Sequence, residues 1–372
     1  MDRYDNPAPA SFSKRLILSY ALDWVVLIVV IIAAVLLGRL SPTKRPFSLE
    51  DQSLTFPRST ETVPIWLAMV LCVLVPLVII FLFVLLLVPG ANSFSKPTSR
   101  LTIVRRKLWE IHVGWLGLAL SVIIAFFITE TAKGLLGKPR PYMLSVCDPD
   151  LANAADHLVG SGKLYAASIC RQTDTKLLNE AFRSFPSGHS SCSAAGLTYL
   201  SLFLASKLRI TTPFFPRSGS PYSAGLLDSW VAKKDHDGSE YDSHTRTITS
   251  RPRLARTQAA APPIYLLALC LVPIFLAIFI AASRWFNFMH HGFDVIVSFL
   301  VGLLTAFLGF SYYHTPISVG SGWAWGPREK HHAFWAGVGG DLPVEEQARR
   351  LGDSRGEDVE LGAYAGNHRA NY

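Results

Sequence analysis

The sequence predicts an all-α, polytopic membrane protein in which six transmembrane helices form a bundle. Half of the 372 residues are hydrophobic and only 17% are charged, whereas about a quarter of an average soluble domain is charged. The apolar residues are concentrated in six blocks, each long enough to cross a bilayer of roughly 30 Å as a helix. The chain also carries a net charge of +8, and its basic residues fall in the links between the blocks.

The predicted spans cover residues 16–37, 63–88, 108–128, 189–208, 263–282 and 292–313. The first is longer than the roughly 7–15 apolar residues of a signal peptide and ends at no small-residue cleavage site, so we expect a signal anchor. Pro76 and Pro273 fall inside spans and predict kinks. The expected organisation is an N-terminal segment 1–15, a six-span domain 16–313 and a tail 314–372.

Charge predicts the orientation of these spans. Basic residues crowd the link between the second and third spans and the link between the fourth and fifth, which places both links and both termini in the cytosol. The loop 129–188 and the short link around Arg284 then face the lumen or the exterior of a vacuole, Golgi, endoplasmic reticulum or plasma membrane. Residues 214–261, rich in Ser, Pro, Gly and charge, are expected to be a flexible cytosolic insert. The tail is expected to be flexible and cytosolic, with Trp323, Trp325 and Trp335 at the interface.

The cysteines fall into two groups. Cys72, Cys192 and Cys270 lie in apolar blocks and are expected to behave as small hydrophobic residues. Cys147 and Cys170 lie in one polar loop and are not spaced as a zinc site. A disulfide between them depends on whether that loop meets an oxidising compartment, which the sequence leaves open.

A histidine and a carboxylate lie close together at the start of the sixth span, where residues 283–294 read SRWFNFMHHGFD. His290 and Asp294 are four residues apart, so on a helix they share a face and can hydrogen-bond. A carboxylate that holds one imidazole nitrogen leaves the other free to act as a nucleophile. Arg284 offers a planar fork for phosphate oxygens. His291 is expected to point away from Asp294.

The fourth span opens on a possible anion site, Pro-Ser-Gly-His, at residues 186–189. Ser187 can cap the helix and Gly188 lets an anion approach the backbone closely. Helix N-termini bind phosphate through free N–H groups and the macrodipole. His189, in the first turn, would be placed to protonate a leaving oxygen.

Two cations follow the third span, in KGLLGKPRP at residues 133–141. Lys133 ends the span, and Pro139 disfavours helix before it, so Arg140 is expected on a turn. Two such cations could clamp a phosphoryl group. Lys and Arg at a membrane edge also commonly just extend toward the headgroups, so this motif is weak alone.

Taken in order, Lys-x6-Arg-Pro, Pro-Ser-Gly-His and Ser-Arg-x5-His-x3-Asp resemble the motifs of the type 2 phosphatidic acid phosphatase superfamily. The nearest resemblance is to integral-membrane lipid phosphate phosphatases of the fungal type, over residues 16–313. It implies a bundle with a phosphatidic acid phosphatase/haloperoxidase-type core, and a magnesium-independent hydrolase that needs no metal and no cofactor. The implied substrates are phospholipids in the bilayer: phosphatidate, lysophosphatidate and diacylglycerol pyrophosphate.

The resemblance also implies a role for each motif residue. His290, held by Asp294, would attack phosphorus and form a phosphohistidine, and His189 would protonate the departing alcohol. Water would then hydrolyse the phosphoenzyme. The phosphoryl oxygens would be bound by the remaining motif residues, Lys133, Arg140, Ser187, Gly188 and Arg284.

Other functions were weighed. A metal-dependent phosphatase could use Asp148 and Asp150, but Leu151 and Ala152 follow instead of a hydroxyl residue, and no apolar strand precedes them. A transporter or non-catalytic lipid-binding protein would place charge near the bilayer midplane, not at the span ends. A lipid phosphotransferase such as a sphingolipid synthase stays open if an alcohol replaces water. The sequence contains no soluble basic module of the kind that would predict nucleic-acid binding. The oligomeric state is not predicted.

Overall fold

The computed structural model describes residues 14–87, 100–208, 210, 263–315, 317, 324–326 and 328. The chain divides into two compact units, of which the larger comprises residues 22–325 together with 1–8. The smaller comprises residues 9–21 and 326–372. In this smaller unit, Arg328 donates a hydrogen bond of 2.8 Å to the Ser19 hydroxyl and lies over the ring of Tyr20.

A helix is present at each of the six apolar blocks. They are α1 (Lys14–Arg39), α2 (Ile65–Met69) continued by the π-helical η2 (Val70–Leu74) and α3 (Val75–Leu87), α4 (Arg100–Leu136), α7 (Gly188–Lys207), α10 (Ile264–Phe286) and α11 (Gly292–Tyr313). Five of the six, all but α7, are long and apolar enough to cross a membrane. The prediction of an all-helical membrane bundle is confirmed to that extent.

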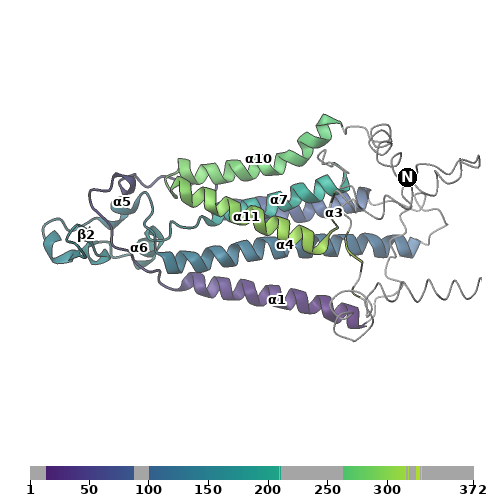
Figure 1. Ribbon diagram of the computed structural model, residues 1–372, viewed down its shortest axis with the longest axis horizontal. Coiled ribbons are helices and arrows are strands. Elements are labelled where there is room, and N and C mark those ends of the chain that lie inside the picture. Colours follow the sequence, from purple (N-terminus) through teal and green to yellow (C-terminus); the bar gives the residue numbers. More distant parts are fainter. Residues whose placement is uncertain are drawn as a thin grey trace, which may run out of the picture. The chain divides into compact units, whose positions relative to one another are not determined.

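The exception, α7, packs against α4, α10 and α11 (Figure 1). Fifteen of its 20 residues are buried, including five serines. Several of its polar groups bond to neighbouring backbones: Ser201 donates to the carbonyl of Cys270 at 2.5 Å, and Tyr199 donates to that of Gly114 at 3.0 Å. A helix enclosed by protein can carry hydroxyl groups because neighbouring segments offer them acceptors, which explains the low hydropathy of α7.

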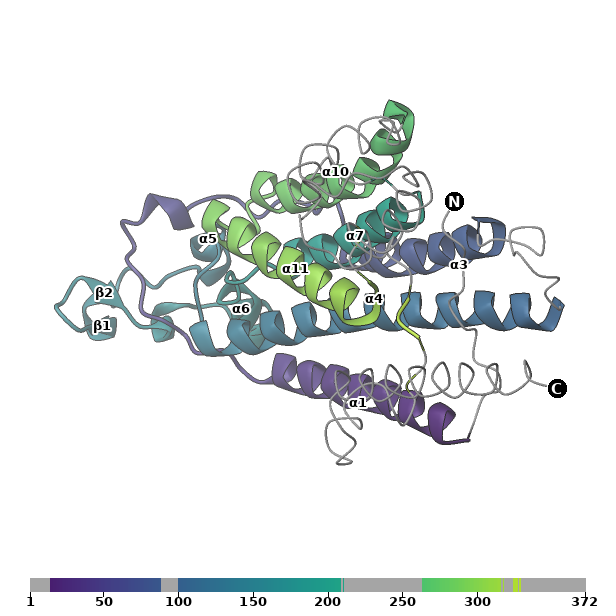
Figure 2. The same cartoon turned by 45° about the vertical axis from the view of Figure 1, so that its right-hand side comes forward.

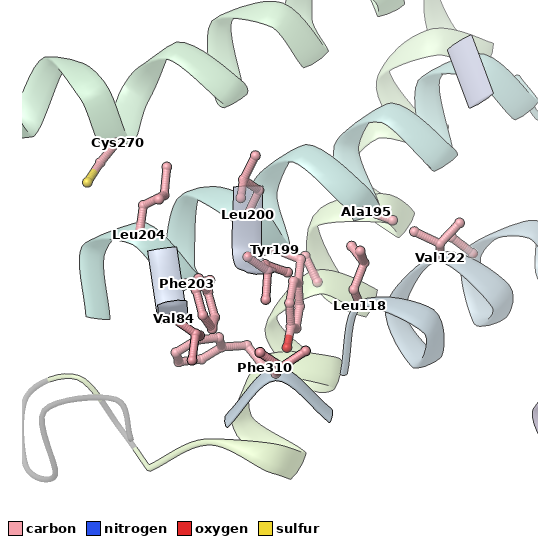
Figure 3. Packing of buried hydrophobic residues seen from close by; sticks show 14 of the residues in the cluster. Val84, Leu118, Val122, Ala195, Tyr199, Leu200, Phe203, Leu204, Cys270 and Phe310 are labelled. Atoms are coloured by element: carbon pink, nitrogen blue, oxygen red, sulfur yellow. The ribbon is translucent and has the colours of Figure 1, made fainter. Parts of the chain in front are cut away.

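The hydrophobic core lies around α7. Aromatic and aliphatic side chains from five helices meet there (Figure 3). Tyr199 and Phe203 of α7 lie beside Phe310 of α11, with Leu118 of α4 and Val84 of α3 completing the contact. The core therefore fixes the same helices whose other ends carry the three motifs.

Helices α7 and α11 approach so closely that a side chain is excluded at their crossing. A Cβ at Gly302 would lie 2.3 Å from the carbonyl oxygen of Ser191 and 2.6 Å from Cβ of Ala194. Such small-residue contacts are a common way for membrane helices to pack. This crossing holds the middle of α11 against the first turns of α7.

The segment between α4 and α7, which we call the cap (residues 137–187), lies at one end of the bundle in both views (Figures 1 and 2). It contains the short elements α5 (Met143–Cys147), η4 (Ala154–His157), β1 (Leu158–Val159), β2 (Leu164–Tyr165), η5 (Ala167–Ile169) and α6 (Thr175–Ala181). The two strands form an antiparallel pair, and Tyr165 also bridges to Phe47. A disulfide joins Cys147 to Cys170, which answers the question the sequence left open.

Several predictions fall on residues that are not described. The insert 214–261, Trp323 and Trp335 lie outside the described residues, as does nearly all of segment 1–15 and most of the tail. Trp325 is described: its backbone carbonyl accepts a hydrogen bond of 3.0 Å from the indole of Trp109. Its side chain is half exposed.

Candidate active site

The three motifs meet at the cap end of the bundle. The C-terminal ends of α4 and α10 and the N-terminal ends of α7 and α11 all lie there (Figure 2). The charges of Lys133, Arg140 and Arg284 all act on both His189 and His290. The structure therefore brings two imidazoles and three cations from four separate segments into one cluster.

His290 lies in the link between α10 and α11 and is buried. Its Nδ1 hydrogen-bonds the backbone carbonyl of Ser184 in the cap, at 2.5 Å. Burial and the nearby charges of Arg140 and Lys133 lower the pKa of His290 well below its usual value. The imidazole is therefore neutral near pH 7, with Nδ1 donating to the carbonyl and Nε2 left as the basic nitrogen.

The predicted pairing of His290 with Asp294 is wrong in this structure. Helix α11 begins at Gly292 with His291 as its N-cap, so His290 is not on the helix and the four-residue spacing does not align the two side chains. The Asp294 carboxylate, which is fully buried, instead accepts hydrogen bonds from the Ser184 hydroxyl at 2.5 Å and from Lys138 at 2.7 Å.

The expectation for His291 is also wrong. Its backbone N–H and its Nδ1 each lie 3.2 Å from Oδ2 of Asp294, which makes a capping box at the start of α11. The Ser184 hydroxyl lies 3.2 Å from the same ring nitrogen. Asp294 thus holds the helix start and the cap loop together, and it reaches His290 only through Ser184.

The second motif forms the start of α7 as expected, with one correction. Ser187 is the N-cap residue, but its side chain makes no capping hydrogen bond. Its backbone N–H instead donates to the hydroxyl of Ser298 at 2.6 Å, so that group is not free for an anion. The N–H groups of Gly188 and His189 belong to the first turn, where helical N–H groups have no partner within the helix.

Gly188 and His189 both face the cation cluster. A Cβ at Gly188 would lie 3.0 Å from the ammonium nitrogen of Lys133, so the absence of a side chain lets that cation approach the helix start. His189 donates a hydrogen bond to the backbone carbonyl of Val63, and its Nε2 is buried without a partner. An unpartnered buried nitrogen of this kind calls for an explanation, and a ligand provides one.

The first motif is arranged as predicted: Lys133 lies in the last turn of α4, and Arg140 lies beyond the helix end. Gly137 ends the helix in a left-handed conformation with φ of 55°. Arg140 donates to the carbonyl of Arg183 and to the hydroxyl of Tyr142. Arg284, in α10, is 1% exposed and donates to the carbonyl of Val63 at 3.2 Å.

Five participants were missed by the sequence reasoning. They are Lys138, Ser184 and the three glutamates that pair with the motif cations, Glu61, Glu130 and Glu180. Lys138 and Ser184 lie inside or beside the motifs and could have been considered as neighbours. Glu61 is 223 residues from its partner Arg284, so no local pattern reveals it.

No metal site accompanies this cluster in the part of the chain that is described, where no three His, Cys, Asp or Glu side chains are grouped to hold an ion. The two loop aspartates weighed above have other partners. Asp148 forms an ion pair with Arg171, and Asp150 accepts hydrogen bonds from Ala152 and Asn153.

Comparison with known proteins points to one family. The family model described as PAP2 superfamily matches residues 114–318, which is more than half of the chain. The chain is 33% identical over 201 residues to a PA-phosphatase related-family protein of Dictyostelium discoideum, covering 53% of this chain and 55% of that one. The chain thus spans little more than half of that relative.

Two further relatives have names that state an activity. A probable lipid phosphate phosphatase of Arabidopsis thaliana is 27% identical over 298 residues, covering 78% of this chain and 71% of the relative. A probable diacylglycerol pyrophosphate phosphatase of Schizosaccharomyces pombe is 30% identical over 170 residues, covering 45% of this chain and 53% of the relative. No solved structure gives a significant match.

Proposed function

Because this chain belongs to the PAP2 superfamily, we propose that it is a membrane-embedded phosphomonoesterase that hydrolyses lipid phosphates without magnesium. Phosphatidate, which would give diacylglycerol, is the leading substrate, with lysophosphatidate and diacylglycerol pyrophosphate as further candidates. The names of the relatives support this choice of substrates. The observation that carries the proposal is the cluster itself, where three cations act on two buried imidazoles.

In the proposed complex, the phosphoryl group lies among Lys133, Arg140 and Arg284 at the start of α7. Cations and the N–H groups of a helix start would share its three non-bridging oxygens. The same contacts would stabilise the charge on these oxygens in the transition state. Gly188 contributes by leaving space for the anion beside the Lys133 ammonium group.

The proposed chemistry needs the two histidines in different protonation states, with His290 neutral and His189 protonated. The Nε2 of His290 would attack phosphorus, forming an N–P bond as the bond from phosphorus to the lipid oxygen breaks. The negative charge of the incoming phosphate would favour a protonated His189, whose Nε2 proton would pass to the departing oxygen. Water would then attack the phosphohistidine with its proton taken by His189, releasing phosphate and freeing His290.

Asp294 has an indirect part in this proposal. Through the Ser184 hydroxyl it fixes the loop whose carbonyl holds Nδ1 of His290, and it keeps the imidazole in one tautomer. Lys138 balances its charge at 2.7 Å. Asp294 is therefore a positioning residue in this scheme.

The proposal includes an orientation. All six helices would cross the membrane, with α7 enclosed by the others, both termini in the cytosol and the cap in the lumen or exterior. The Cys147–Cys170 disulfide supports this side for the cap, because disulfides persist in oxidising compartments. A substrate could then keep its acyl chains in the bilayer while its phosphate enters the site.

The activity test uses the full chain purified in detergent, phosphatidate in mixed micelles, and EDTA. We expect release of inorganic phosphate by the wild-type protein and none by His290→Ala. His157→Ala is the matched control, since this histidine hydrogen-bonds Ser168 in the exposed part of the cap. Near-normal phosphate release by His290→Ala would refute the nucleophile assignment.

The orientation is tested with glycosylation acceptor sites inserted in single copies. A site near Ala154 in the cap should be modified, whereas one near position 237, outside the described residues, should not. The opposite pattern of modification would mean that the assigned sides are reversed.

A further inference from the structure

Each cation that is proposed to bind phosphate already has a carboxylate partner in this structure. The three ion pairs come from different parts of the chain, with the glutamates contributed by α4, by α6 and by the link before α2. They are Lys133–Glu130 at 2.5 Å, Arg140–Glu180 at 2.8 Å and Arg284–Glu61 at 3.1 Å. Within each pair the two charges cancel.

Two of the three pairs are asymmetric in their exposure, whereas Lys133 and Glu130 are both mostly buried. The side chains of Arg284 and Arg140 are 1% and 9% exposed, whereas those of their partners Glu61 and Glu180 are 36% and 55% exposed. The glutamates therefore reach the buried cations from the side of the solvent. Either carboxylate can turn back into water without leaving a buried charge of its own unpaired.

The arginines do not depend on these carboxylates for their position. Arg284 also donates to the carbonyl of Val63, and Arg140 to the carbonyl of Arg183 and the hydroxyl of Tyr142. These neutral acceptors stay in place if a glutamate leaves. The site thus has fixed donors and exchangeable acceptors.

Glu180 is ionised at neutral pH, as an exchangeable counter-ion must be. Partial desolvation acts to raise its pKa, but four cations together outweigh that effect and the pKa lies below the usual value; they are Arg140, Lys133, Arg183 and Arg58. A bound phosphate must therefore replace a full negative charge at Arg140.

We propose that Glu61 and Glu180 are exchangeable counter-ions that keep the phosphodiester headgroups of ordinary membrane lipids from occupying the site. This inference rests on the proposed function. A phosphomonoester carries a charge of about −1.5 to −2 at pH 7 and gains nearly twice the Coulomb energy of a monoanion at the same cations. A phosphodiester carries a single charge, as a carboxylate does, and gains little by displacing one.

The test measures inhibition in micelles of full-length protein and phosphatidate, with phosphatidylglycerol or inorganic phosphate as the competitor. Glu180→Gln and Glu61→Gln remove one charge each at exposed side chains, so both should fold. We expect the inhibition constant for each competitor to fall by about 1.5- to fivefold per variant, the range given by partly exposed ion pairs. Glu180→Asp should restore the wild-type value, and Glu50→Gln, at an exposed turn, should not change it.

A purely structural role for the glutamates predicts the opposite sign, because a disordered site binds every anion less well. Unchanged or higher inhibition constants in both variants would overturn the counter-ion proposal. If the wild-type protein releases no phosphate from phosphatidate, the proposed function fails. Calorimetric titration with inorganic phosphate would still test whether the glutamates are exchangeable counter-ions. Tighter binding to Glu180→Gln would then support the exchange, and equal binding would reject it.

Discussion

The coupling of Asp294 to His290 through Ser184 makes a quantitative prediction for Asp294→Asn. The substitution keeps the shape of the side chain but removes the charge that accepts hydrogen bonds from Ser184 and Lys138. Lys138 is 35% exposed, so water can solvate its ammonium group after the change. The main loss is a hydrogen bond to a charged acceptor, worth about 1.5–3 kcal/mol.

If that energy holds the Ser184 carbonyl in position on Nδ1 of His290, kcat should fall by about ten- to a few hundredfold. A carboxylate bonded directly to the catalytic imidazole gives a larger loss, about 10⁴-fold in the serine proteases. The assay is steady-state phosphate release from phosphatidate. The size of the loss therefore separates an indirect contact from a direct one.

The control is Ser184→Ala, which removes the hydroxyl and leaves the backbone carbonyl that contacts His290. Since the two substitutions break the same link, the double variant should be scarcely slower than the slower single variant. A loss near 10⁴-fold for Asp294→Asn, or additive losses in the double variant, would refute the indirect path.

Two further predictions concern stability. Gly302→Val should lower the thermal midpoint in detergent by an amount equivalent to about 1–3 kcal/mol, since its Cβ would overlap the carbonyl oxygen of Ser191. The control Gly134→Ala, at a position with open space around it, should not lower the midpoint. Equal midpoints for the two variants would contradict the close helix crossing. Replacing Cys147 and Cys170 by Ser removes a disulfide that closes a loop with a sequence separation of 23. This should lower the free energy of unfolding by about 3 kcal/mol. Limited proteolysis should then cut the cap faster, and an unchanged rate would show that the cap is held by its other contacts.

The positions of the helices could be predicted from the sequence because a long apolar block indicates a segment buried in lipid or protein. The ends were less readable. Helix α4 begins at Arg100, earlier than the predicted 108, and the added turns contain the buried Arg106 and also Lys107, whose ammonium group donates to the carbonyl of Leu85 at 2.7 Å. A charge that finds a partner inside the bundle does not mark the end of a span, and the partner is invisible in one linear sequence.

The members of the site were readable from their residue types, whereas their contacts were not. The pairing of His290 with Asp294 was inferred by extending α11 two residues too far. The helix start is set by His291, which caps it together with Asp294, and histidine is not among the residues that usually signal an N-cap. The glutamate partners depend on the tertiary fold alone.

During synthesis, α7 emerges before two of the helices that bury it, since α10 and α11 follow residue 263. Its serines and threonine make it a poor candidate to enter lipid unaided, because a hydroxyl in hydrocarbon lacks an acceptor until a neighbouring backbone supplies one. Of its partners, only α4 and the helix formed by α2, η2 and α3 are available at that stage. Stable insertion of α7 should therefore depend on the later helices, so chains truncated before α10 should leave the histidine-bearing helix vulnerable to quality-control proteolysis.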